Sequence, residues 1–123
     1  MRCDAEKVIE AISSIRLTDI PEEYEIHKLV EYTFQNREIN YIHEASLGRG
    51  RRVDFLVNRT AVEIKKGAPA PAALVKQLSG YLESEEVDEI VAVTRRRVKL
   101  PEKIAGKCVY ALSLDRLWGV TLP

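Results

Sequence analysis

The sequence predicts an α/β fold in which a central β-sheet of about five strands is flanked by helices. Two patterns lead to this prediction. Apolar residues recur at helical spacing in some segments, whereas in others they alternate with polar residues or run continuously. The expected order is α-α-βββ-α-β-β-α. A chain of 123 residues fits one domain that is large enough to bury a core without disulfides or a structural metal. Residues 1–20 are expected to form an N-terminal helical extension of this domain.

Two amphipathic helices are expected first. Residues 4–15 carry apolar side chains at helical spacing, with Asp4 as a candidate N-cap. Residues 22–37 carry a second apolar stripe. Glu22 lies within this stripe and Glu25 lies on its edge, so either acid is placed to reach a buried site. A solvated carboxylate on the helix surface is the alternative.

Three strands are expected next. Residues 39–47 read as one strand, and the glycine-rich turn at residues 48–50 leads into a hairpin. Polarity alternates along residues 51–66 on both sides of a break at Asn58 and Arg59. A loop of two or four residues at this break gives the same strand pairing, whereas a three-residue loop would shift the pairing by one residue.

The unshifted register places Asp54 directly opposite Glu63, with Lys65 on the same face. Like charges opposite each other destabilise a sheet, and a bound cation would reverse that effect. We therefore expect a metal-binding pair, with ordinary surface charges on a solvated hairpin as the alternative. The core face is expected to hold Val53, Phe55, Val57, Thr60, Val62 and Ile64, and the polar face Arg52, Asp54, Leu56, Ala61, Glu63 and Lys65.

The C-terminal half is expected to alternate between helix and strand. Residues 71–84 resume a helical pattern after an Ala-Pro-Ala-Pro stretch. Residues 89–94 and 107–112 are apolar strands, separated by a loop through Pro101 in which a short helix would fit. Residues 113–118 resemble a short terminal helix that begins at a serine cap.

The composition argues against several kinds of site. Cys3 and Cys108 lack metal-ligand spacing, so neither an iron–sulfur cluster nor a structural zinc site has its ligands. His27 and His43 are the only histidines, so a His-rich catalytic zinc site is not expected. The apolar runs are shorter than a membrane span and the N-terminus lacks a signal-peptide core. A cytoplasmic location is therefore expected.

The formal net charge is zero, but the charges are unevenly distributed. Residues 1–44 carry five Lys or Arg against ten Asp or Glu, whereas residues 45–123 carry fourteen against nine. Basic residues gather beside the hairpin and again in residues 95–99, where they are suited to contact phosphates; a solvated face is the alternative. The expected nucleic-acid contacts are Arg49, Arg51, Arg52, Lys66, Arg95, Arg96 and Arg97.

An Asp on the second strand of a three-strand meander, followed by Glu-x-Lys on the third, resembles the PD-(D/E)xK nuclease superfamily. The resemblance covers roughly residues 22–112 and rests on a handful of positions. It implies a restriction-endonuclease-like core with a mixed central sheet. It also implies that Asp54 and Glu63 bind Mg²⁺ or Mn²⁺ together with the carbonyl of Ile64, while Lys65 assists the attacking water.

The same resemblance implies an acid from the helix before the strands, which here would be Glu25 or Glu22. Gln77 and Tyr81 are similar to the QxxxY element of the exonuclease-like branch. Because they are four residues apart, they share a helix face, and we expect them to position the attacking water or a phosphate. Val53 stands where the family name has Pro, a variable position without a chemical role.

The expected function is metal-dependent hydrolysis of DNA phosphodiester bonds by a deoxyribonuclease that selects a structure or an end rather than a sequence. DNA is the expected partner. A small neutral domain offers limited area to a duplex, so a homodimer or a larger nuclease complex is also expected. The alternative is a non-catalytic nucleic-acid-binding or assembly module, or a partner-dependent subunit, on the same fold.

Overall fold

The computed structural model describes residues 3–16, 22–65, 67 and 69–117. The helices are α1 (Asp4–Ser13), α2 (Glu23–Asn36), α3 (Pro71–Leu82) and the single turn α4 (Leu114–Leu117). The strands are β1 (Ile42–Gly48), β2 (Arg51–Val57), β3 (Thr60–Lys65), β4 (Glu89–Thr94), β5 (Lys103–Ile104) and β6 (Lys107–Ser113).

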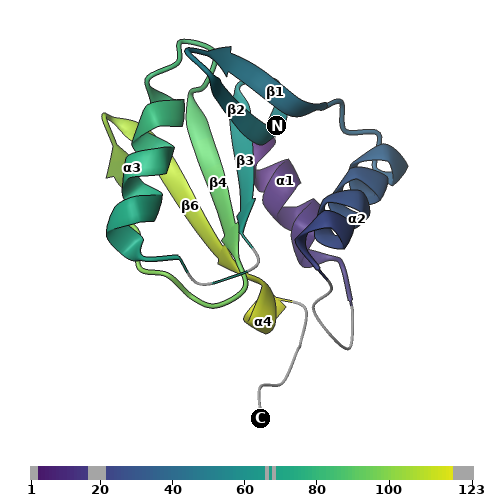
Figure 1. The fold of residues 1–123 in the computed structure, drawn as a ribbon. Coiled ribbons are helices and arrows are strands. Elements are labelled where there is room, and N and C mark those ends of the chain that lie inside the picture. The colour runs from purple at the N-terminus through teal and green to yellow at the C-terminus, as the bar shows by residue number, and fades with distance from the viewer. Residues whose placement is uncertain (1–2, 17–21, 66, 68, 118–123) are drawn as a thin grey trace.

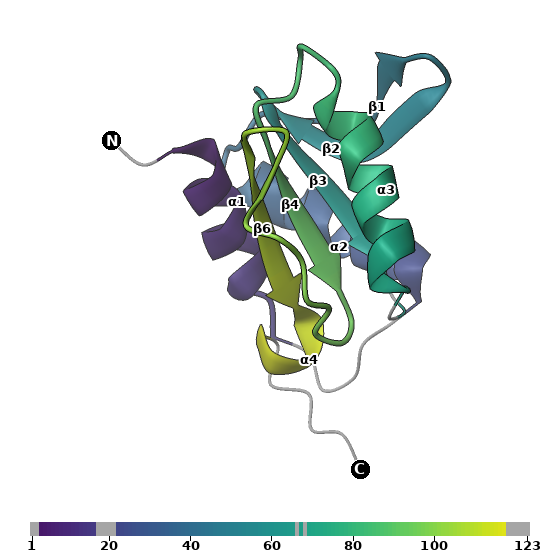
Figure 2. The same ribbon diagram turned by 90° about the vertical axis from the view of Figure 1, so that its left-hand side faces the viewer.

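In this part of the chain, six strands form one mixed sheet in the order β1-β2-β3-β4-β6-β5. Helices α1 and α2 cover one face and α3 covers the other (Figure 1). Figure 2 shows the sheet edge-on between these helical layers. The predicted α/β architecture, with a mixed sheet flanked by helices, is thus confirmed. No helix of the described residues is long and apolar enough to cross a membrane.

Helix α1 belongs to the segment expected as an extension, yet it is part of the core. It buries Ala5, Val8, Ala11 and Ile12 against α2 and the sheet. The N-cap position is occupied by Cys3, so the prediction that Asp4 caps the helix is wrong. Asp4 is the first helical residue, and its Oδ2 accepts a hydrogen bond of 3.1 Å from Asn58 Nδ2 in the β2–β3 turn.

The predicted register of the β2–β3 hairpin is confirmed. Phe55 pairs with Val62 and Val57 with Thr60, so the loop between the strands has two residues. Asn58 adopts a φ of 53°, a left-handed conformation that asparagine tolerates better than most residues. A turn without glycine therefore still sets the register that the alternation of polarity predicts.

Strands β3, β4 and β6 are parallel and in register, so their carboxyl ends lie at the same edge of the sheet. Lys65 at the end of β3 pairs with Thr94 at the end of β4, which in turn pairs with Ser113 at the end of β6. Ligands in open α/β sheets bind outside the carboxyl ends of strands. A ligand-binding site is therefore expected at this edge of the sheet.

The hairpin face that was expected to be polar is largely buried. Leu56 and Ala61 pack under α3 in a second hydrophobic cluster, which also contains Val53. Phe55 instead packs in the cluster of α1 and α2, so the predicted alternation from Val53 to Phe55 is wrong. On β1, Glu44 lies between the residues paired with these two and has a φ of 53°. Both strands thus change face at the level of Asp54.

A sixth strand, β5, lies in the loop where a short helix was expected. Lys103 and Ile104 pair with Cys108 and Lys107 at the start of β6. The turn between them uses left-handed conformations at residues 105 and 106. A strand of two residues carries no alternation of polarity, so its sequence offers no signal for it.

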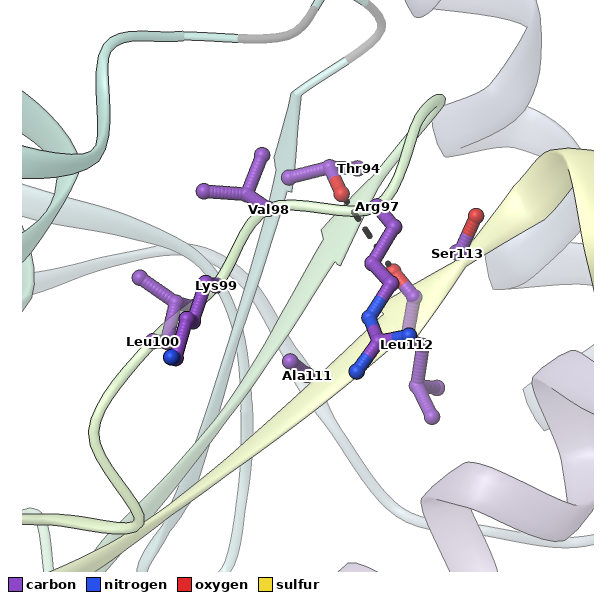
Figure 3. Close-up of a pocket in the computed structure, with 8 residues that line it drawn as sticks. All are labelled: Thr94, Arg97, Val98, Lys99, Leu100, Ala111, Leu112 and Ser113. Atoms are coloured by element: carbon purple, nitrogen blue, oxygen red, sulfur yellow. Dashed lines mark hydrogen bonds between the residues drawn. The ribbon is translucent and has the colours of Figure 1, made fainter.

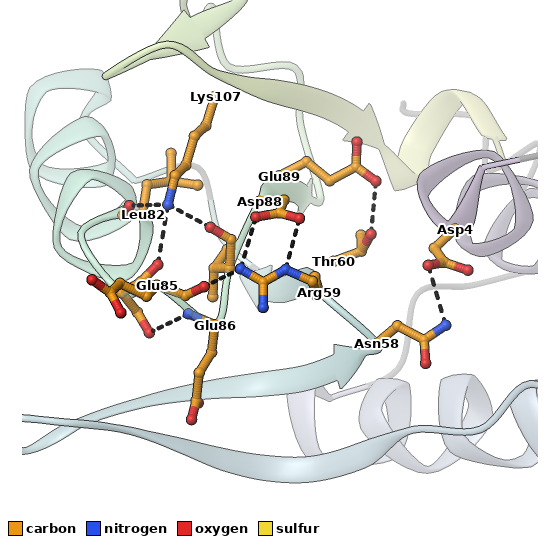
Figure 4. A network of polar contacts seen from close by, with 12 residues as sticks. Asp4, Asn58, Arg59, Thr60, Leu82, Glu85, Glu86, Asp88, Glu89 and Lys107 are labelled. Carbon is orange, nitrogen blue, oxygen red and sulfur yellow. Dashed lines mark hydrogen bonds and ion pairs between the residues drawn. The ribbon is translucent and has the colours of Figure 1, made fainter.

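The loop that joins α3 to β4 is fastened to its surroundings by two cations (Figure 4). Lys107 Nζ donates to the carbonyls of Leu82, Ser84 and Val87 at 2.8, 3.1 and 2.5 Å. Arg59 donates to both carboxylate oxygens of Asp88 and to the carbonyl of Glu85. These bonds satisfy carbonyls at the end of α3 and hold that end against the sheet.

Candidate functional site

The candidate site is a split between β2 and β3. The pairing of the two strands extends as far as Phe55 and Val62, and beyond it side chains replace the backbone ladder. The N–H of Asp54 donates to Glu63 Oε1 at 3.2 Å, and the N–H of Ile64 donates to Asp54 Oδ2 at 2.7 Å. Each carboxylate is therefore positioned by the backbone of the opposite strand.

Glu63 is held from the α3 side of the sheet. Its Oε2 accepts hydrogen bonds from Tyr81 Oη at 3.0 Å and from Gln77 Nε2 at 3.1 Å, and it lies 3.4 Å from Lys65 Nζ. Gln77 also donates to Tyr81 Oη at 2.9 Å. The predicted residues Lys65, Gln77 and Tyr81 thus converge on one carboxylate oxygen.

The surroundings of the two carboxylates disfavour their ionised forms. The Glu63 side chain is only 4% exposed, and burial, reinforced by the charge of Asp54, raises the pKa of Glu63 to about 7. Burial likewise raises the pKa of Asp54. Burial and the charge of Glu63 raise the pKa of Tyr81, so its hydroxyl stays a hydrogen-bond donor at neutral pH. Lys65 is thus the cation that acts on both Asp54 and Glu63.

Helix α2 contributes His27, which sequence reasoning did not select. Its Nε2 is buried and lies 3.6 Å from Asp54 Oδ2, and it has no hydrogen-bond partner among the described residues. Burial lowers the pKa of His27, so the ring is neutral at neutral pH. The sequence signal was present: His27, Val30 and Phe34 follow helical spacing on the inner face of α2.

A small acidic pocket lies on the α2 side of the split. It has a volume of about 330 Å³, and its wall includes three acids against one lysine: Glu23, Glu31, Glu44 and Lys28, together with His27 and His43. The negative charge of Glu23 acts to raise the pKa of both His27 and Asp54, although burial lowers that of His27 overall. Such a concentration of negative charge favours the approach of a cation.

The predicted helix acid is not part of this arrangement. Glu25 is exposed on α2, and no hydrogen bond or ion pair within the described ranges joins it to Asp54 or Glu63. Glu22 occupies the N-cap position of α2 and is also exposed. Ile64 enters the site through its backbone, where its N–H binds Asp54; the expected role of its carbonyl as a metal ligand stays a prediction.

One group of predicted basic residues lines a groove beside α3. The groove has a volume of about 720 Å³, and Arg51, Arg52 and Lys76 line it together with Gln77 and Tyr81. Its floor therefore includes the two residues that hold Glu63. Arg49 is exposed in the β1–β2 turn with a φ of 54° and does not line the groove, and Lys66 lies outside the described residues.

Arg51 lies across α3 at Gly80. Its Nη1 donates to Glu83 Oε2 at 2.8 Å, and a Cβ added to Gly80 would lie 2.9 Å from Arg51 Nε. The absence of a side chain at Gly80 thus makes room for the guanidinium. This accounts for a glycine inside the last turn of α3, although glycine costs up to about 1 kcal/mol relative to alanine within a helix.

The second basic group is divided by the fold. Arg95 turns towards Asp115, with 3.7 Å between Nε and Oδ1, and its carbonyl accepts the Asp115 N–H at 3.0 Å. Arg96 is exposed, whereas Arg97 lines a separate pocket at the ends of β4 and β6. The three adjacent arginines therefore do not act as one patch.

No group of three or more His, Cys, Asp or Glu side chains in the described ranges forms a recognisable metal-binding cluster. Asp54, Glu63 and the unpaired Nε2 of His27 are nevertheless neighbours around the split. Comparisons of the chain with family models, curated proteins and solved structures gave no significant match. The chemistry of the site is therefore inferred from its residues and their geometry alone.

Proposed function

We propose that this protein is a divalent-metal-dependent nuclease that hydrolyses phosphodiester bonds in DNA, on a core like that of the PD-(D/E)xK nucleases. The observation that carries the proposal is the buried Glu63 beside the partly buried Asp54, with Lys65 Nζ 3.4 Å from Glu63. A structural ion pair needs one carboxylate for one lysine. A second carboxylate beside it, itself partly buried, adds an electrostatic cost that a further cation would offset.

The donors around the split fit Mg²⁺ or Mn²⁺. Asp54 and Glu63 offer carboxylate oxygens, which these ions prefer, and His27 offers a buried nitrogen without a partner. When bound, such an ion would polarise the scissile phosphate and stabilise the negative charge that develops on it. Burial is the main cause that raises the pKa of both carboxyls, and a bound cation would favour their ionised forms.

Within this proposal, the residues of the chain have distinct tasks. Lys65 is 33% exposed, so its ammonium can reach both Glu63 and a substrate phosphate or water. Gln77 and Tyr81 are positioning residues, because both donate to Glu63 Oε2. Their contact with Glu63 differs from the sequence-based expectation that Gln77 and Tyr81 position the attacking water or a phosphate.

The groove beside α3 would hold the DNA backbone. Arg52 and Lys76 line it, together with Arg51 in its ion pair with Glu83, and cations on a groove wall bind phosphates without reading the base sequence. The groove extends to Gln77 and Tyr81 and hence towards Glu63. A strand bound there would therefore approach the carboxylate pair, as expected for a nuclease that selects a structure or an end. A second copy or another protein would supply the remaining area for a duplex.

A cleavage assay tests the proposal. Linear, circular, single-stranded and branched DNA are incubated with Mg²⁺ or Mn²⁺ and with wild type, Lys65→Ala or Lys103→Ala. Lys103 is an exposed lysine of β5 and serves as the matched control. We expect Lys65→Ala to lower the rate by about 10²- to 10⁴-fold and Lys103→Ala to leave it unchanged. If wild type binds DNA but neither wild type nor Lys65→Ala cleaves any of the substrates, the protein is a binding module on this fold. Equal cleavage rates for the two proteins would remove the proposed role of Lys65.

A further inference from the structure

The pocket at the carboxyl ends of β4 and β6 is separate from the carboxylate pair and its groove. It has a volume of about 670 Å³, within the usual range for sites that bind small ligands. Thr94 and Ser113 lie at the strand ends, and Val98, Leu100, Ala111 and Leu112 supply apolar lining. The pocket is thus a hollow with apolar walls and hydroxyl groups at one end.

Two cations border this hollow without a carboxylate partner. Arg97 and Lys99 line the pocket, and no ion pair joins either of them to an acidic residue in the described part of the chain. Figure 3 shows the guanidinium of Arg97 and the ammonium of Lys99 on either side of Ala111. This contrasts with Arg95, which is neutralised by Asp115 at 3.7 Å. The pocket therefore offers two positive charges separated by an apolar floor.

The pocket lies next to the proposed catalytic lysine. Thr94, in its lining, pairs with Lys65 across β3 and β4. Neighbouring strands are about 4.8 Å apart, so the pocket begins one strand spacing from the end of β3. A nucleic-acid strand that has its scissile phosphate at Lys65 can therefore place a neighbouring nucleotide in this hollow.

We infer that the pocket binds one nucleotide of the substrate strand, with the phosphates on its two sides contacting Arg97 and Lys99. The sugar and base contact the apolar walls. The hydroxyls of Thr94 and Ser113 donate to the carbonyls of Arg96 and Arg95, so their oxygens are left as acceptors for polar atoms of the nucleotide. A nucleotide seated in a hollow is not paired with a second strand, so the substrate is single-stranded at this point. This inference rests on the proposed nuclease function and specifies its substrate.

The inference is tested by an NMR titration of the full-length protein in metal-free buffer with thymidine 3′,5′-bisphosphate, a single nucleotide that carries both phosphates. We expect amide shifts in residues 94–100 and 111–113. Arg97→Ala and Lys99→Ala should each weaken binding about tenfold, since each removes one charge-assisted contact. Arg96→Ala is the matched control, because Arg96 is an exposed neighbour that does not line the pocket. Arg97→Gln repeats the test with a longer side chain.

Several results would overturn the inference. These are shifts confined to the groove beside α3, equally tight binding of inorganic phosphate, or an equal loss of affinity in Arg96→Ala and Arg97→Ala. The titration requires neither metal nor cleavage. Binding in the pocket without any DNA cleavage would remove the proposed function alone, whereas cleavage without binding in the pocket would remove this inference alone.

Discussion

Replacing Glu63 by glutamine should remove most of the pH dependence of stability that the carboxylate pair creates. Burial and the charge of Asp54 raise the pKa of Glu63 from 4.5 to about 7 in the folded protein. The folded state therefore holds this proton more tightly than the unfolded state does. Below about pH 4.5 both states are protonated and Glu63 costs nothing; the cost grows as the pH rises to about 7 and is complete above it.

The magnitude follows from the two pKa values. One pKa unit corresponds to about 1.4 kcal/mol, so an ionised Glu63 destabilises the metal-free fold by about 3 kcal/mol above pH 7. Because Glu63 is only 4% exposed, solvent screening reduces this value little. Between about pH 5 and about pH 8, wild type should lose about 2–3 kcal/mol of stability that Glu63→Gln does not lose.

Urea unfolding with EDTA, monitored by circular dichroism, measures this difference. The matched control is Glu25→Gln, which changes an exposed acid of α2 and should keep the pH dependence of wild type. Saturating Mn²⁺ should restore stability to wild type above pH 7, because a ligand of the folded state stabilises it. Parallel stability curves for wild type and Glu63→Gln between the two pH values would refute the reasoning.

Two further predictions concern α3. Gly80→Ala should displace Arg51 and weaken DNA binding by about tenfold while raising helix stability by up to about 1 kcal/mol; unchanged anisotropy of a labelled oligonucleotide would contradict it. Lys107→Met should lower the free energy of unfolding by about 1–3 kcal/mol, because three carbonyls lose their donor, whereas Lys103→Met should have little effect. Equal urea midpoints for these two lysine variants would contradict the second prediction.

The hairpin register was predictable from sequence because polarity alternates on both sides of Asn58 and Arg59, which centres a two-residue loop there. That register also brings Asp54 and Glu63 together, and Lys65 follows two residues later on the same strand. The spacing of Gln77 and Tyr81 correctly placed both on one face of α3. Their common partner, Glu63, depends on how α3 packs over β3, which local spacing does not determine.

Other parts of the site depend on tertiary structure. Glu25 or Glu22 was expected as the helix acid from the family resemblance, whereas the side chain of α2 that approaches Asp54 is His27. The change of face between Val53 and Phe55 arises where two strands are distorted together, so neither strand shows it alone. The division of Arg95 from Arg97 likewise follows from the contact with Asp115.

The most direct test of the central claim is calorimetric titration of Mn²⁺ into wild type, Asp54→Ala and Glu25→Gln near pH 7. We expect one site in wild type and in Glu25→Gln, and an affinity at least about tenfold lower in Asp54→Ala. Binding should release about half a proton, since Glu63 with a pKa of about 7 must ionise to act as a ligand. Equal affinities for wild type and Asp54→Ala, or no binding to wild type, would contradict the account.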